Sequence, residues 1–176
     1  MFKQNQVIRA SAKIKSREEL GLEIKKLREA GSVVVFTNGC FDLLHPGHVK
    51  YLEEAKSWGD FLVVAVNSDE SVKRIKGSDR PVMDERSRCE VLAGLHCVDF
   101  VTTFSEDTPK EIIDELLPGV LVKGGDWPKN QIVGRETVEK HGGIVMNIKF
   151  EAGFSTTGVI RKIEKAALAR GSGSSE

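Results

Sequence analysis

Residues 33–48 read VVVFTNGCFDLLHPGH, and the fold of the chain can be worked out from this stretch. It opens with a continuous apolar run, Val33 to Phe36, which is typical of a strand buried on both faces of a sheet. The run stops at Asn38-Gly39, and a loop leads to a helical segment from about Pro46 to Trp58. The stretch therefore predicts a buried strand, a polar loop and a helix in succession.

The same alternation continues along the chain. Further strands are expected at 61–66, 98–103, 120–122 and 144–148, and helices at 70–76, 85–95, 110–116, 135–141 and 156–169. Alternating strands and helices imply right-handed crossovers and a parallel sheet between two layers of helices. We expect a Rossmann-like α/β fold in a single domain, with ligands bound beyond the carboxyl ends of the strands.

The segment before the first strand, residues 1–31, is predicted to be an arm and a helix outside that domain. Its first fifteen or so residues are polar and unpatterned, as in a mobile arm. Ser16 and Glu19 match a capping box, and apolar side chains recur at helical spacing between Leu20 and Leu27. An amphipathic helix is therefore expected after the arm.

Length and composition set further limits. The chain has 176 residues, enough for one core, and we place the domain at 32–170 and a flexible glycine- and serine-rich tail at 171–176. Its 26 basic and 26 acidic residues cancel, so nothing global favours nucleic acid or a membrane as a partner, and any anion site must be local. Three cysteines without metal-type spacing, and no apolar leader or spanning run, favour the cytoplasm.

Two histidines, His45 and His48, flank a Pro-Gly pair where the first strand gives way to a helix. Two imidazoles and the free amides of a helix start then surround one point, and a helix amino end attracts phosphate by roughly 0.3 to 1 kcal/mol per contact. Gly47 would let a phosphate or base approach the backbone. These features suit a nucleoside triphosphate. Two alternatives remain open: ordinary helix-start residues, or a metal pair with Cys40 and Asp42.

The whole segment is more specific than the histidine pair. The spacing Gly-x-Phe-Asp-x-x-His-x-Gly-His, from Gly39 to His48, resembles the signature of the cytidylyltransferase-like nucleotidyltransferases. The resemblance implies that His45 and His48 are catalytic, contacting the triphosphate and stabilising the transition state at the α-phosphorus. It also implies ATP contacts from the same loop: Asn38, Gly39, Cys40, Phe41, His45, Gly47 and His48. Asp42 either bonds loop amides or lies near the metal, and we group it with the substrate-binding residues.

The last loop, Gly153-Phe154-Ser155-Thr156-Thr157, opens the final helix. Ser155 or Thr156 is a suitable N-cap, which is a sufficient structural explanation by itself. In the family, the matching run binds the outer phosphates through hydroxyls and helix-end amides. The resemblance therefore assigns ATP contacts to Ser155, Thr156 and Thr157, which would clamp the triphosphate together with the first loop.

The residues before that glycine bear on the choice of nucleotide. Cytidylyltransferases of this family usually carry Arg-Thr-Glu there, whereas this chain has Phe150-Glu151-Ala152. The missing arginine weakens a CTP assignment. Instead, the pattern Phe-x-x-Gly-aromatic-Ser-Thr-Thr, which runs from Phe150 to Thr157, resembles the heptose phosphate adenylyltransferases, which use ATP. The Phe104–Pro109 run resembles the same enzymes.

Two middle loops complete the expected site. Lys123, Gly125 and Asp126 follow the fourth strand, where the family has a Lys-Gly-Gly-Asp run near the adenosine, although a plain Gly-Gly turn is an alternative. Basic residues follow the second strand, and a solvated basic face is their ordinary explanation. Because a sugar phosphate must lie beside ATP at this edge, we favour four contacts to it in addition to Asp42. They are Asn67, Lys76, Arg80 and Arg88.

The resemblance spans roughly residues 33–163 and is nearest to the heptose 1-phosphate adenylyltransferases. It implies the transfer of AMP from ATP to D-glycero-D-manno-heptose 1-phosphate, giving ADP-heptose and pyrophosphate for lipopolysaccharide core or surface polysaccharide. Mg²⁺ or another divalent cation is the implied cofactor, with unassigned ligands, and a homo-oligomer, dimer or higher, is expected by analogy. Glycerol 3-phosphate cytidylyltransferase, flavin or pantetheine adenylyltransferase, and a non-catalytic nucleotide-binding module are the alternatives.

Overall fold

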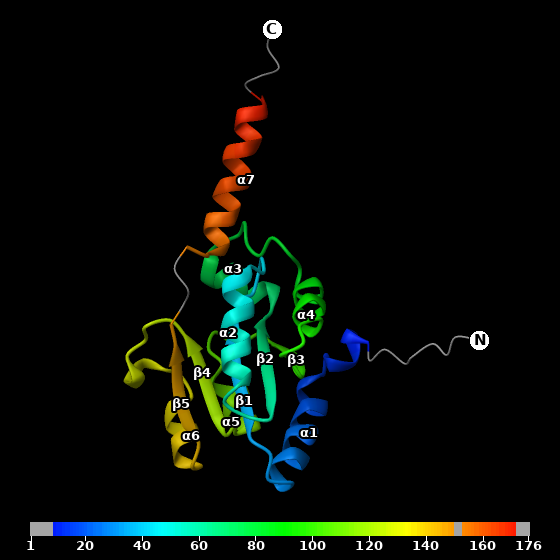
Figure 1. Ribbon diagram of the computed structural model, residues 1–176, viewed down its shortest axis with the longest axis vertical. Helices are drawn as coiled ribbons and strands as arrows, with labels where there is room; N and C mark the ends of the chain where they lie inside the picture. The colour runs from blue at the N-terminus through cyan, green and yellow to red at the C-terminus, as the bar shows by residue number, and fades with distance from the viewer. Residues whose placement is uncertain (1–8, 150–152, 172–176) are drawn as a thin grey trace, which may run out of the picture.

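Five parallel strands form the centre of the molecule in the computed structural model, which describes residues 9–149 and 153–171. Their order across the sheet is β3-β2-β1-β4-β5 (Figure 1). The strands are β1 (Val34–Gly39), β2 (Phe61–Asn67), β3 (Phe100–Phe104), β4 (Val120–Gly124) and β5 (Ile144–Ile148). The predicted parallel α/β sheet is confirmed.

Helices connect the strands and cover both faces of the sheet (Figure 1). They are α1 (Arg17–Glu29), α2 (Pro46–Lys56), α3 (Asp69–Lys76), α4 (Glu85–Ala93), α5 (Lys110–Leu116), α6 (Arg135–Lys140) and α7 (Thr156–Gly171), with short 3₁₀ turns η1 (Ala10–Lys13) and η2 (Lys129–Gln131). Each predicted helix is present, and the ends shift by at most a few residues. None of the helices described is both long and apolar enough to cross a membrane.

The apolar run of β1 is explained by the two layers of helices. Successive side chains in a strand point to opposite faces, so a strand covered on both sides needs apolar residues throughout. Val35 packs in the cluster that includes residues of α2 and α4, whereas Val34 and Phe36 pack with α1, α5 and α6. Val33 is 41% exposed, so the buried run begins one residue later than predicted.

Helix α1 is part of the same core. The predicted capping box is present, because Ser16 and Glu19 each bond the backbone N–H of the other. The side chains of Leu20 and Ile24 are 0% and 1% exposed and pack with the residues of β1 and α5. The boundary drawn at residue 31 therefore does not separate two packed units.

The mobile-arm prediction is wrong for residues 9–15. Lys13 Nζ donates to the carbonyls of Leu95 (3.0 Å) and Val98 (2.7 Å), and Ile14 forms a bridge to Val101. These contacts come from distant parts of the chain, so a polar segment without periodicity gives no local sign of them. Residues 1–8 of the arm and 172–176 of the tail lie outside the described residues.

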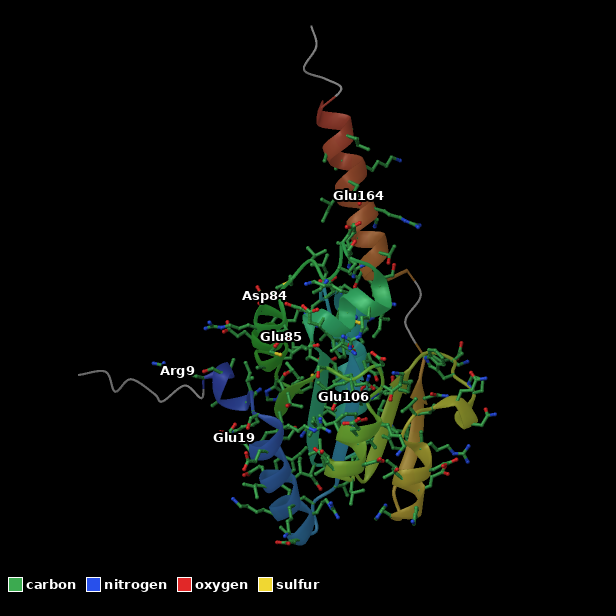
Figure 2. The ribbon with its side chains drawn as sticks, turned by 180° about the vertical axis from the view of Figure 1, so that it is seen from behind. Arg9, Glu19, Asp84, Glu85, Glu106 and Glu164 are labelled. Atoms are coloured by element: carbon green, nitrogen blue, oxygen red, sulfur yellow. The ribbon has the colours of Figure 1, made fainter. Side chains whose placement is uncertain are left out.

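The sheet order brings several loops to one place. The chain runs outward from β1 to β2 and β3 on one side, and β4 and β5 lie on the other side of β1, so the order reverses between β1 and β4. Such a switch point leaves a crevice beyond the strand ends. Helix α7 starts near this edge and stands away from the body in both views, with Glu164 on its projecting part (Figures 1 and 2).

Candidate active site

A cavity of about 440 Å³ opens at the carboxyl ends of β1 and β4. Its walls come from the end of β1 and the loop to α2, from α3 and the loop after it, from the end of β4, and from the start of α7. Predicted site residues that line it are Asn38, Gly39, Cys40, Phe41, Asp42, His45, His48, Lys76, Arg80, Lys123, Ser155, Thr156 and Thr157. Four more lining residues were not predicted: Tyr51, Gly124, Trp127 and Phe154.

The glycines of the first loop allow close packing around the histidines. A Cβ added at Gly47 would lie 3.1 Å from Phe154 Cβ and 3.2 Å from His45 Nδ1. The space expected for a ligand at Gly47 is therefore taken by the protein itself. At Gly39 a Cβ would meet the ring of Phe41 at 3.0 Å, and Phe41 adopts a left-handed φ of 46°. Both glycines serve the packing of this loop.

The two histidines stack on each other at the start of α2. Their ring centroids are 3.8 Å apart and their planes differ by 14°. His45 occupies the N-cap position, and the backbone N–H of His48 donates to His45 O at 2.9 Å. Within the described part of the chain, each ring has a buried Nδ1 that lacks a hydrogen-bond partner. Buried polar atoms are rarely left unpaired, so the pair is suited to a polar ligand.

Burial, together with a smaller effect of the neighbouring His45, lowers the pKa of His48 from 6.5 to about 4. His48 is therefore neutral at neutral pH when the cavity holds no anion. The negative charge of a triphosphate would favour the protonated ring and oppose this shift.

Tyr51, one of the lining residues that was not predicted, lies three residues after His48 on α2. Its hydroxyl shares a 2.6 Å hydrogen bond with Thr37 Oγ1. Helical spacing from His48 is the signal that could have identified Tyr51.

The start of α7 lies beside this loop. Thr156 Oγ1 donates to Leu43 O at 3.3 Å, and the rings of Phe154 and His45 are 6.1 Å apart. Ser155 Oγ accepts from Gly158 N at 3.0 Å, which is an N-cap contact. The amino ends of α2 and α7 therefore meet at one wall of the cavity, as an anion clamp would require.

Lys123, near the end of β4, also lines the cavity. Its ammonium donates to Asn38 Oδ1 at 3.5 Å, and burial lowers its pKa. Gly125 and Asp126, predicted beside the adenosine, are not among the residues that line the cavity, and Asp126 is exposed. The neighbouring Trp127 does line it, with its indole N–H donating to Gly124 O at 3.1 Å.

Asp42 bonds the loop before α4. It is 2% exposed and accepts hydrogen bonds from Val82 N (2.8 Å), Met83 N (3.0 Å) and Arg80 Nε (2.6 Å). Burial alone would raise the pKa of Asp42, but the two amides and the guanidinium outweigh it and keep the pKa below the usual value. Of the two interpretations left open, the structure favours the bonding of loop amides over a substrate or metal contact.

Arg88 is not a phosphate contact in this structure. It is 1% exposed and does not line the cavity. Its guanidinium donates to the carbonyls of Met83 (3.0 Å), Cys40 (2.5 Å) and Asn67 (2.8 Å), and pairs with Asp69 at 2.8 Å. The sequence could not show that the side chain turns inward. Arg88 instead connects the segments after β1, after β2 and before α4.

The remaining predicted substrate contacts differ in access. Asn67 is 5% exposed, and its amide donates to Ser71 Oγ at 3.0 Å, so it lies outside the cavity. Arg80 lines the cavity but is paired with Asp42. Lys76, at the end of α3, is exposed and lines the cavity. Among the described residues there is no group of three or more His, Cys, Asp or Glu that could hold a metal.

Comparisons with known proteins agree with this geometry. Residues 36–162 match the family model described as cytidylyltransferase-like. The chain is 51% identical over 159 residues to the bifunctional protein HldE of Geotalea uraniireducens (strain Rf4), and 52% identical over 151 residues to HldE of Actinobacillus pleuropneumoniae serotype 5b (strain L20). These matches cover 90% and 86% of this chain but 32% of each relative, so the chain spans about a third of their length.

Two solved structures are also similar. The lipopolysaccharide core biosynthesis protein from Thermoplasma volcanium GSS1 has a TM-score of 0.57 and 32% identity, with coverage of 69% of this chain and 98% of that one. The pantoate-beta-alanine ligase from Francisella tularensis, solved with an ATP compound and beta-alanine, has a TM-score of 0.57 and 16% identity, covering 82% of this chain and 69% of that one. The second likeness concerns the fold alone.

Proposed function

The chain belongs to the cytidylyltransferase-like family, and we propose that it is an adenylyltransferase that moves AMP from ATP to a heptose 1-phosphate. The products are ADP-heptose and pyrophosphate, for lipopolysaccharide core or surface polysaccharide. The observation that carries the proposal is the stacked pair His45 and His48, with buried unpaired nitrogens, beside the amino ends of α2 and α7. The solved relative concerned with lipopolysaccharide core biosynthesis supports the choice of acceptor.

The reaction needs positioning more than protein nucleophiles. An oxygen of the sugar phosphate attacks the α-phosphorus in line, and the bond from that phosphorus to the pyrophosphate oxygen breaks. The attacking oxygen is already ionised at neutral pH, so no general base is required. His45 and His48 donate to the triphosphate, and the hydroxyls and amides at the start of α7 hold the departing pyrophosphate.

Mg²⁺, or another divalent cation, belongs to the proposal as a companion of the triphosphate. The described residues offer no preformed cage of ligands, and Mg²⁺ is often held mainly by substrate phosphates and water. When bound there, the ion neutralises phosphate charge. The protein's part is then to orient the phosphates through the histidines and the two helix ends.

Assembly into a homo-oligomer, dimer or higher, is a further part of the proposal. Helix α7 projects from the body, and its Ile163 and Leu168 are 60% and 76% exposed (Figure 1). Sedimentation of the whole chain tests this expectation. Species of two or more chains are expected, and a monomer at micromolar concentration would contradict it.

The choice of nucleotide is tested by a panel. The preference for ATP over CTP rests on the sequence Phe150-Glu151-Ala152, where the arginine typical of cytidylyltransferases is missing. These three residues lie outside the described part of the structure. Pyrophosphate release is measured with ATP or CTP against heptose 1-phosphate, glycerol 3-phosphate, FMN and phosphopantetheine. Release with ATP and the heptose phosphate is expected. Faster release with CTP and glycerol 3-phosphate would favour the cytidylyltransferase alternative, and ATP binding without any release would favour a binding module.

A further inference from the structure

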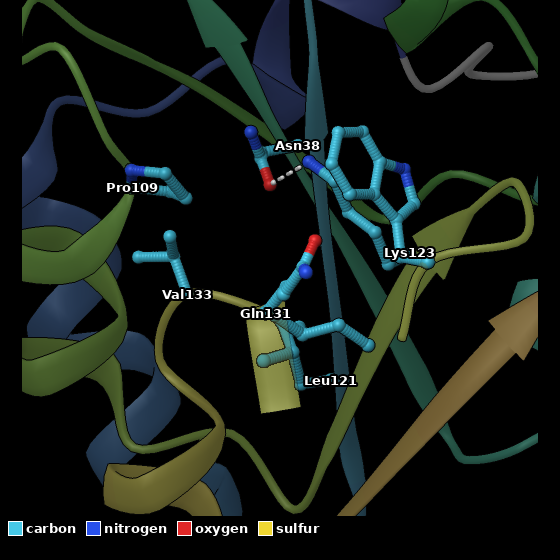
Figure 3. Close-up of a pocket in the computed structure, with 8 residues that line it drawn as sticks. Asn38, Pro109, Leu121, Lys123, Gln131 and Val133 are labelled. Carbon is cyan, nitrogen blue, oxygen red and sulfur yellow. Dashed lines mark hydrogen bonds between the residues drawn. The ribbon is translucent and has the colours of Figure 1, made fainter. Parts of the chain in front are cut away.

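A second, smaller cavity of about 140 Å³ adjoins the first (Figure 3). The two cavities share Asn38, Lys123 and Trp127, so they meet at the ends of β1 and β4. Figure 3 shows Gln131 and Val133 on the other side of the small cavity from Asn38. No residue of this cavity other than Asn38 and Lys123 was predicted from the sequence.

The small cavity approaches the strand ends from the face opposite the histidines. Leu121, which lines it, packs with the residues of α5 and α6, whereas α2 covers the other face. Side chains two residues apart in a strand share a face. Lys123 therefore lies on the face of Leu121, and Asn38 on the face of Phe36, which is the same one. The two side chains stand where the cavities join.

The in-line geometry of the transfer limits where the attacking phosphate can lie. The attacking and departing oxygens lie on opposite sides of the α-phosphorus. If the pyrophosphate is held at the α2 and α7 ends, the attacking phosphate must come from across the strand ends. Lys76, Cys40 and Lys123 all line the large cavity, and Lys123 also lines the small one, so a phosphate bound at Lys123 would lie where the two cavities join. The group attached to that phosphate then points toward the small cavity.

The lining of the small cavity suits a sugar. Asn38 and Gln131 supply amides that donate and accept hydrogen bonds, as hydroxyls require. Leu121, Val133 and the ring of Trp127 supply apolar surface for C–H groups. Trp127 is 49% exposed, yet its bond to Gly124 O holds the ring in place. A mostly apolar cavity with a few placed polar groups is typical of a small-molecule site.

We propose that this cavity binds the sugar of the acceptor, with its phosphate at Lys123 facing the histidines. The proposal rests on the proposed function and deepens it, because it makes Gln131, Trp127 and Val133 the residues that select the sugar. It also moves the sugar from the segment after β2, where the sequence suggested it, to the opposite side of β1.

Two variants test the site. Val133→Trp fills the cavity at a position that is 39% exposed, and Gln131→Leu removes an amide at similar volume. The KM for heptose 1-phosphate is expected to rise about tenfold or more, because a hydrogen bond or the space for the ring is lost. The KM for ATP is expected to change by less than about twofold. Val91→Trp, on α4 at 44% exposure and away from both cavities, is the matched control.

Binding and folding measurements separate the possible outcomes. Thermal unfolding shows whether each variant folds, and calorimetry follows heptose 1-phosphate binding in the presence of a non-reactive ATP analogue. Loss of sugar phosphate binding in Val133→Trp, with binding kept in Val91→Trp, supports the site even without turnover. A rise in the KM for ATP alone would show that the nucleoside occupies the cavity. Unchanged constants for both substrates would also overturn the proposal, whereas absent turnover in the unmodified chain would count against the proposed function instead.

Discussion

His48 combines a buried unpaired nitrogen with a pKa of about 4, and it stands where a triphosphate would meet α2. If the ring donates to oxygens on which charge grows, its loss should reduce turnover without disturbing the fold. Removing one such donor typically costs about 2.7 to 4 kcal/mol in the transition state. We therefore expect His48→Ala to lower kcat by roughly 10² to 10³ fold.

Turnover of His48→Ala is measured in a steady-state assay beside that of His96→Ala. This control makes the same substitution at an exposed residue that lines neither of the two cavities. That control should keep near-normal turnover. If His48→Ala also turned over normally, the catalytic assignment of His48 would fail.

The pKa of His48 predicts how stability depends on pH. Because its pKa is lowered in the folded chain, the unfolded chain binds the extra proton between pH 6.5 and about 4. The free energy of unfolding should therefore fall as the pH drops from 7 to 5. Urea denaturation at both pH values should show a smaller drop for His48→Asn than for the unmodified chain. Equal drops in the two proteins would contradict the assigned pKa.

At the scale of elements, Arg88 connects three segments that the sheet alone does not hold together. Arg88→Met would leave the carbonyls of Cys40, Asn67 and Met83 without their donor and Asp69 without its partner. We expect a loss of about 3 kcal/mol in the free energy of unfolding, as for a broken buried pair.

Arg86→Met is the control, because this side chain is 85% exposed in an i,i+4 pair with Glu90 and should cost less than about 0.5 kcal/mol. Urea denaturation of the two variants decides the matter. Similar losses would show that the buried contacts of Arg88 add little.

Helix α1 supplies a second prediction at this scale. Leu20 is 0% exposed and Leu22 is 60% exposed, so the same substitution separates core packing from helix propensity. Leu20→Ala should lower the free energy of unfolding by about 2 to 5 kcal/mol, and Leu22→Ala by well under about 1 kcal/mol. The midpoints of chemical denaturation provide the measurement. A small effect at Leu20 would mean that α1 is a dispensable extension.

The elements also show what a sequence can predict. The capping box and the strand-helix alternation are encoded by neighbouring residues, and both were found as predicted. The contacts of Lys13 and Arg88 join parts of the chain that are far apart in sequence, so no local pattern could indicate them. Loop motifs fixed the position of the cavity, whereas the direction of individual side chains required the fold.

For the whole molecule, the reversal of strand order between β1 and β4 gathers the histidine loop, the Lys123 loop and the start of α7 at one edge. The parallel sheet was predictable because the alternation of strands and helices along the chain is compatible with few sheet topologies. The small cavity was not, because Trp127, Gln131 and Val133 come from the segment between β4 and α6, where the sequence has no strand or helix periodicity. Its position on the opposite face follows only from the assembled sheet.

The most direct test of the central claim is one incubation of the whole chain with ATP, Mg²⁺ and both anomers of D-glycero-D-manno-heptose 1-phosphate. Mass spectrometry follows the nucleotide sugar, and a coupled assay follows pyrophosphate. Equal amounts of ADP-heptose and pyrophosphate from one anomer are expected, and neither product should form without the sugar phosphate. Absence of ADP-heptose with both anomers, while the chain still binds ATP, would contradict the proposed adenylyl transfer.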